Sequence, residues 1–150
     1  MKIQEKIELS IREAMKEKNS DKLIALRSIK SEMLLESTKG VDKIISEEIF
    51  INIVTKLVKQ RKDSAKIYIE QNRQDLADEE LSQLKYIEVY LPKQISETEI
   101  ILEVQAVIKQ IGASNISDFG RCMGLLVKKL KGKADSSIVS RLLKGQLEKL

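Results

Sequence analysis

The sequence predicts an all-α fold, and three observations support this prediction. Apolar residues recur every three or four positions along most of the chain, as in Ile3, Ile7, Ile11 and Met15, which is the spacing of an amphipathic helix. Only one proline and six glycines occur in 150 residues, which is unusual for a chain rich in loops or strands. Residues that commonly begin or end helices separate the apolar stretches.

The N-terminal part of the sequence is predicted to form four helices. The first covers about residues 2–18, and residues 19–21 form a turn that starts the second, which ends at residues 38–40. Ser46 is expected to cap a long third helix, because the two glutamates that follow it suit the positive end of the helix dipole. Residues 72–74 then interrupt the apolar pattern.

Asp75 is expected to cap the fourth helix, which carries Leu84, Ile87 and Leu91. Pro92, the one proline of the chain, cannot continue that helix. The sequence therefore predicts a four-helix domain over residues 1–92 and a smaller three-helix domain over residues 93–150.

Three further helices are expected in the C-terminal part. Ser96 and Glu99 have the spacing of a capping box, which begins the fifth helix, and Gly112 ends it. The sixth helix is expected to end at Gly132, and Asp135 is expected to cap the seventh.

Composition excludes several classes of function. The chain has no histidine, which removes Ser-His-Asp triads and histidine-containing zinc sites, and it has no glycine-rich nucleotide-binding loop. The single cysteine, Cys122, excludes an internal disulfide and indicates a reducing compartment, so we expect a cytoplasmic protein without a membrane span. No cofactor, metal site or independent catalytic motif is expected.

The positive charge of the chain is concentrated at its C-terminal end. Residues 119–150 contain eight Lys or Arg and two Asp or Glu, a net charge of +6, whereas the whole chain carries +4. A basic cluster of this kind suits contacts with nucleic-acid phosphates, although a solvated helix surface is the competing interpretation. The candidate phosphate-binding residues are Arg121, Lys128, Lys129, Lys131, Lys133, Arg141 and Lys144.

Two other features of the sequence leave alternatives open. Gly120 and Gly124 lie four positions apart in the sixth helix, which indicates close approach of another helix or of a ligand backbone. Arg27, Lys30 and Arg61 fall among apolar positions of the second and third helices. They indicate either buried ion pairs, with Glu79, Glu80 or Asp63 as partners of Arg61, or an anion-binding groove between those helices.

Several segments resemble the GatB/YqeY family, in order and spacing along nearly the whole chain. They are LRSIKS from Leu26, KQRKDS from Lys59, RQDLA from Arg73, EVYLPKQ from Glu88, GAS from Gly112, MG from Met123 and LKGKAD from Leu130. The resemblance implies an all-helical protein with a larger N-terminal and a smaller C-terminal unit.

The resemblance also implies a function. A related domain forms the tail of the GatB subunit of the tRNA-dependent amidotransferase, where it is a tRNA-binding appendage outside the catalytic parts. We therefore expect a tRNA-binding accessory protein that uses its basic C-terminal helices. The alternatives are a protein-interaction adaptor for an aminoacyl-tRNA synthetase or amidotransferase, and a non-catalytic component of that amidotransferase. A helix-turn-helix DNA binder fits less well, because the start of the seventh helix offers serines and no bidentate base reader.

Overall fold

A computed structural model describes residues 2–40 and 44–150, and every regular element in these residues is a helix. This confirms the all-α fold class. The chain divides into two compact units, which we call unit 1 (Met1–Leu91) and unit 2 (Pro92–Leu150). Each unit has a hydrophobic core of its own.

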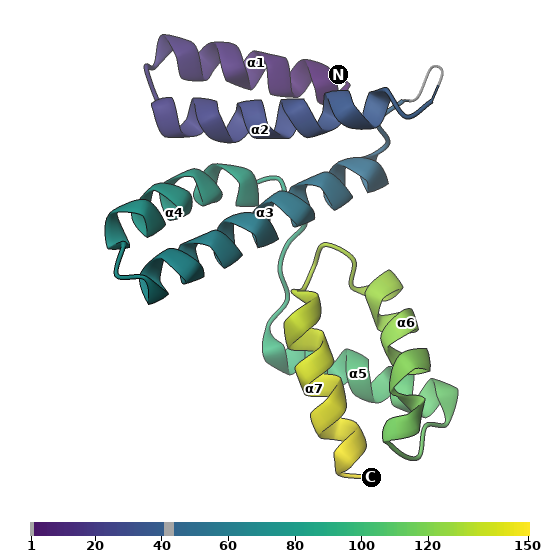
Figure 1. Cartoon of the computed structure of the whole chain (residues 1–150). Helices are drawn as coiled ribbons and strands as arrows, with labels where there is room; N and C mark the ends of the chain where they lie inside the picture. The colour runs from purple at the N-terminus through teal and green to yellow at the C-terminus, as the bar shows by residue number, and fades with distance from the viewer. Residues whose placement is uncertain (1, 41–43) are drawn as a thin grey trace. The chain divides into compact units, whose positions relative to one another are not determined.

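Unit 1 contains α1 (Ile3–Lys16), α2 (Ser20–Ser37), α3 (Glu47–Glu70) and α4 (Gln74–Glu88). Figure 1 shows α1 beside α2 and α3 beside α4, and α2 also packs against both α3 and α4. Helix α2 therefore connects the two helix pairs into one unit.

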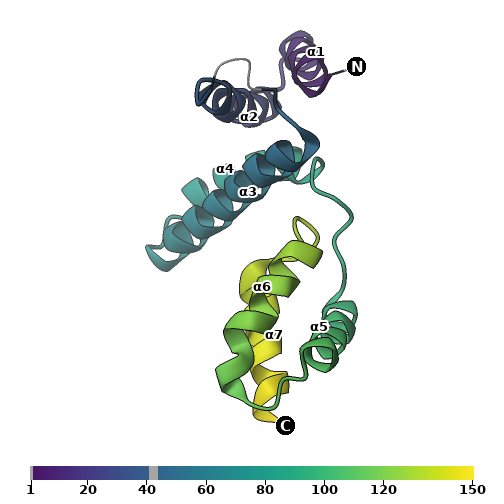
Figure 2. The same ribbon diagram turned by 90° about the vertical axis from the view of Figure 1, so that its right-hand side faces the viewer.

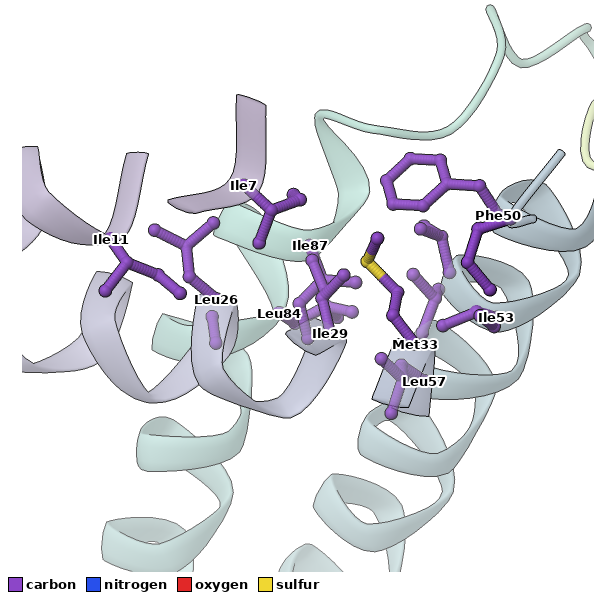
Figure 3. Close-up of a cluster of buried hydrophobic side chains, with 14 of the residues drawn as sticks. Ile7, Ile11, Leu26, Ile29, Met33, Phe50, Ile53, Leu57, Leu84 and Ile87 are labelled. Atoms are coloured by element: carbon purple, nitrogen blue, oxygen red, sulfur yellow. The ribbon is translucent and has the colours of Figure 1, made fainter. Parts of the chain in front are cut away.

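The core of unit 1 is formed where these four helices meet. Ile7, Leu26, Ile29 and Ile87 are almost completely buried there, and Figure 3 shows them together with side chains of α3. Burying a large aliphatic side chain stabilises a fold by about 1.5–3 kcal/mol, so this cluster supplies the main drive for folding unit 1.

Polar side chains fix the ends of the helices in unit 1. Asn19 caps α2, where its Oδ1 accepts a hydrogen bond from the Lys22 amide at 3.1 Å and its Nδ2 donates to the Tyr86 hydroxyl at 3.0 Å. Ser46 caps α3 as expected. The expectation that Asp75 caps α4 was wrong. The cap position is Arg73, and Asp75 lies in the first turn, where its carboxylate pairs with that arginine.

Unit 2 contains α5 (Glu97–Ile111), a short 3-10 helix η1 (Ile116–Asp118), α6 (Phe119–Lys129) and α7 (Ser136–Glu148). The three α-helices all pack against one another, and Figure 2 shows α5 beside α6 and α7. Their core includes Val104, Cys122, Leu126 and Leu143, each 0% exposed.

The helix ends of unit 2 follow the sequence closely. Ser96 caps α5 by accepting from the Glu99 amide at 3.2 Å, and Gly112 ends it with a φ of 74°, a conformation that glycine adopts without steric cost. Helix α6 ends at Lys129, and Gly132 adopts a φ of 74° in the turn that follows. Asp135 caps α7, since its Oδ1 accepts from the Ser137 amide at 2.9 Å.

The close approach of another helix, one of the two alternatives for Gly120 and Gly124, is absent among the described residues. Both glycines are exposed, and a Cβ atom added at either position would meet no neighbouring atom within 4 Å among the described residues. The two glycines therefore lie on an open surface of α6 and do not serve helix packing within the described structure.

Candidate nucleic-acid interface

The basic residues predicted to bind phosphate all lie in unit 2 and are all exposed to solvent. They come from α6, from the turn after it and from α7, namely Arg121, Lys128, Lys129, Lys131, Lys133, Arg141 and Lys144. Their apolar neighbours on the same helices, such as Leu126 and Leu143, face the core instead. The amphipathic pattern of α6 and α7 thus places the basic side chains on the solvent-exposed surface.

Three of these seven cations are held in ion pairs within unit 2. Arg121 pairs with Asp118 at 2.9 Å. Lys129 pairs with Glu103 of α5 at 3.0 Å, and Arg141 pairs with Glu97 of α5 at 2.6 Å. Carboxylates from α5 and η1 therefore offset part of the positive charge of α6 and α7. Lys131 also has an interaction partner within the chain.

Asp118 makes a second interaction besides its ion pair with Arg121. Its carboxylate accepts a hydrogen bond from the Ser114 amide at 2.9 Å, and this bond, followed by the bond from Arg121, holds the pKa of the carboxyl below its ordinary value. The Asp118 carboxylate therefore fixes the turn between α5 and α6.

The other three cations remain available to a ligand. Lys128, Lys133 and Lys144 are exposed and make no ion pair or side-chain hydrogen bond with the part of the chain that the structure describes. An unpaired ammonium can bind a phosphate without first losing an intramolecular partner. These lysines are the strongest candidates of the predicted set.

The turn between α6 and α7 is joined to the segment that precedes α5. The Gln94 side chain donates from Nε2 to the Gly132 carbonyl and to the Pro92 carbonyl, the latter at 2.8 Å. The Ile95 amide donates to the Lys133 carbonyl at 3.0 Å. Lys93, next to Gln94 in the chain, is exposed and likewise has no partner among the described residues.

Sequence reasoning missed Lys93, because the net charge of its own segment is negative. Residues 93–118 contain two Lys or Arg and four Asp or Glu. The signal that points to it is structural: Gln94 links this segment to Gly132, although the two residues are 38 positions apart in the chain.

The three basic residues singled out in unit 1 have different surroundings. Arg61 is largely buried between α3 and α4, with 14% of its side chain exposed, and it pairs with Glu80 at 3.3 Å and hydrogen-bonds Gln83. Its Nε is buried without a hydrogen-bond partner among the described residues. The Arg61 guanidinium thus ties α3 to α4.

Arg27 and Lys30 do not share that arrangement. Arg27 is exposed, so its expected position on the apolar face of α2 was wrong: the buried face of that helix passes through Leu26 and Ile29 instead. Lys30 pairs with Glu8 of α1 at the edge of an open groove of about 180 Å³ between α1 and α2. That groove does not include Arg27 or Arg61.

Cys122 has the surroundings of a core residue. It is 0% exposed, and burial raises the pKa of its thiol above the ordinary value. A thiol that is both inaccessible and protonated is a poor nucleophile. No cluster of three or more His, Cys, Asp or Glu suited to a metal ion occurs in residues 2–40 and 44–150.

Comparison with known proteins identifies the family of this chain. A family model described as Yqey-like protein matches residues 4–147, which covers both units. The chain belongs to the YqeY-like protein family. The resemblance found in the sequence segments is thereby confirmed.

Curated relatives of this YqeY-like chain carry the name Altered inheritance of mitochondria protein 41, mitochondrial. The relative from Pyrenophora tritici-repentis is 26% identical over 140 residues, covering 91% of this chain and 76% of the relative. The relative from Candida glabrata is 30% identical over 128 residues, covering 83% and 66%. The relative from Vanderwaltozyma polyspora is 35% identical over 81 residues, covering 54% of this chain and less than half, 44%, of the relative.

These names correct one expectation from the sequence. The relatives are described as mitochondrial, which contradicts the cytoplasmic location inferred from the single cysteine. The cysteine count does not determine the location, because it indicates only the redox state of a compartment and does not distinguish one reducing compartment from another. Among the described residues, no helix is both long and apolar enough to cross a membrane.

Proposed function

We propose that this YqeY-like protein is a tRNA-binding accessory protein whose unit 2 contacts the phosphate backbone. The observation that carries the proposal is the set of exposed, unpaired lysines on α6, on the following turn and on α7: Lys128, Lys133 and Lys144. Lysines contact phosphates as point charges and give affinity without reading sequence.

The low aromatic content of the chain favours structured RNA as the ligand. Aromatic residues make up 3% of the chain, and unit 2 contains only Phe119, which is partly buried against the core. Single strands are commonly bound by stacking bases on aromatic side chains, and unit 2 offers no such platform. Structured RNA is recognised largely through its shape, its phosphates and its 2′-hydroxyls, which suits a lysine surface.

The experiment is a tRNA-binding titration of the full chain at several salt concentrations. Lys128→Ala, Lys133→Ala and Lys144→Ala are combined in one variant. If each lysine contacts one phosphate, the slope of log affinity against log salt falls by about 3 in the combined variant. The matched control replaces Lys6, Lys16 and Lys66, which are exposed in unit 1 and have no described partner, and it leaves the slope unchanged.

Two results would contradict the proposal. One is the absence of tRNA binding by the parent chain at low salt. The other is an equal loss of affinity in both triple variants, because this would mean that net charge alone governs binding and that no surface of unit 2 is involved.

A protein-interaction adaptor for an amidotransferase or an aminoacyl-tRNA synthetase is the second candidate. The observation that favours it is the exposure of large apolar side chains on α2, where Ile24, Leu34 and Leu35 are 47%, 56% and 60% exposed. Co-purification of such an enzyme that survives nuclease treatment, and that is lost when Leu34 and Leu35 are replaced by serine, would favour this candidate over RNA binding.

A further inference from the structure

Two segments far apart in the sequence form one hydrogen-bonded junction in unit 2. The junction consists of residues 92–95, before α5, and residues 132–133, in the turn after α6. It is held by the hydrogen bond from Gln94 Nε2 to the Gly132 carbonyl and by the bond from the Ile95 amide to the Lys133 carbonyl. Gly132 is buried although it lies in a turn, so the backbone at this point is packed on the protein.

The junction carries two lysines. Lys93 precedes Gln94 and Lys133 follows Gly132, so each lysine adjoins a residue of the same hydrogen bond. Both side chains are exposed, and neither has a partner among residues 2–40 and 44–150. The two hydrogen bonds thus place the lysines on neighbouring segments of the junction.

Among the described residues, the carboxylates at the starts of α5 and α7 form no ion pair with Lys93 or Lys133. Glu97 pairs with Arg141, and the Asp135 carboxylate accepts hydrogen bonds from the amide and the hydroxyl of Ser137. Glu99 accepts a hydrogen bond from the Ser96 hydroxyl at 3.3 Å. The acidic groups at the starts of α5 and α7 are thus engaged in capping and pairing.

We propose that Lys93 and Lys133 form a two-lysine clamp for the phosphate backbone of the bound RNA, with Gln94 as the positioning residue. This inference rests on the proposed function and adds to it a residue outside the basic C-terminal helices. Gln94 joins the two segments before RNA arrives, which lowers the conformational entropy lost on binding. Because both lysines contact the same stretch of backbone, their contributions to affinity depend on each other.

A double-mutant cycle on the full chain tests the clamp, with labelled total tRNA as the probe. The variants are Lys93→Ala, Lys133→Ala and the two combined, each measured in the parent chain and with Gln94→Ala. In the parent chain, each single variant lowers the salt slope by about 1, and the double variant loses less affinity than the product of the single losses. Gln94→Ala leaves the backbone bond from the Ile95 amide to the Lys133 carbonyl, so the coupling between the two losses is expected to become weaker.

The control for a general effect of charge is Lys109→Ala, which removes another exposed lysine of unit 2 without a described partner and leaves the slope unchanged. Reactivity of the buried Cys122 thiol controls for folding of unit 2, since a merely structural role of Gln94 would expose this thiol. A Gln94→Ala chain with a protected thiol and a weaker coupling between the two lysines supports the positioning role, and an unchanged coupling contradicts it.

Failure of the clamp and failure of the proposed function give different results. If Lys93→Ala binds tRNA with the parent slope while the triple variant of Lys128, Lys133 and Lys144 loses affinity, the clamp is wrong and the function stands. If the parent chain does not bind tRNA, both are wrong. If inorganic phosphate at equal ionic strength displaces tRNA, and Lys93→Ala removes this effect, the ligand of the clamp is free phosphate and the RNA assignment is overturned.

Discussion

At the scale of single residues, burial of a charge depends on the partner that the fold supplies. Arg61 is largely buried, and α4 brings Glu80 and Gln83 to its guanidinium. Arg27 occupies a similar position in the apolar pattern of its helix, yet it is exposed. Helical spacing in the sequence predicts where a residue lies on a helix face only to within about one residue position. A difference of one position is enough to separate a buried side chain from an exposed one.

Arg61→Ala is expected to destabilise unit 1, because it leaves the partly buried Glu80 carboxylate without its cation. The expected loss in free energy of unfolding is about 2 kcal/mol, below the cost of breaking a fully buried pair. Tyrosine fluorescence during urea unfolding measures it, since all three tyrosines, Tyr68, Tyr86 and Tyr90, lie in unit 1.

The neighbouring residue provides the control for this substitution. Lys62 pairs with Glu88 at 3.7 Å, and both side chains are largely exposed. Lys62→Ala is expected to change the free energy of unfolding by less than about 0.5 kcal/mol. Equal effects of the two substitutions on the free energy of unfolding would show that the burial of Arg61 does not add to its contribution.

At the scale of elements, short-range signals set where most helices begin and end. Ser46, Ser96 and Asp135 cap the helices that follow them, and Gly112 ends α5 in a left-handed conformation. Asp75 is the exception, because Arg73 takes its carboxylate and the helix begins earlier, at Gln74. A capping residue is predictable from its sequence neighbours unless a second local partner competes for it.

Removing one cap in each unit is expected to destabilise only that unit. Ser96→Ala removes the bond from the Glu99 amide and Ser46→Ala removes the bond from the Ile49 amide, at a cost of about 1 kcal/mol each. Ser96→Ala lowers the urea midpoint for exposure of Cys122, and Ser46→Ala lowers the midpoint of tyrosine fluorescence. A shift of both midpoints by either variant would contradict this separation.

At the scale of the whole molecule, the chain has two separate cores. One is built from α1 to α4, and the other from α5, α6 and α7. The seven candidate phosphate-binding residues and Lys93 all belong to unit 2. A small domain of about 60 residues with its own core can fold alone, and unit 2 contains the whole candidate interface.

A fragment covering Pro92–Leu150 is therefore expected to fold by itself and to bind tRNA with an affinity within about threefold of the full chain. Circular dichroism and protection of Cys122 from a thiol reagent measure folding, and the same salt titration measures binding. The fragment Met1–Leu91 serves as the control and is not expected to bind. A folded unit 2 fragment without tRNA affinity would mean that unit 1 contributes to the RNA contact.

The sequence by itself determined the all-α class, most helix ends and the family, because apolar spacing, capping residues and characteristic segments are local features. It also located the surplus of positive charge in α6, α7 and the turn between them. Only the tertiary structure decided which cations are paired, since Arg141 meets Glu97 across 44 positions of the chain. The same holds for the hydrogen bond from Gln94 to Gly132, from which we propose Lys93 as part of the candidate interface. Contacts of this kind depend on how α5 packs against α6 and α7, and no local pattern in the sequence encodes that packing.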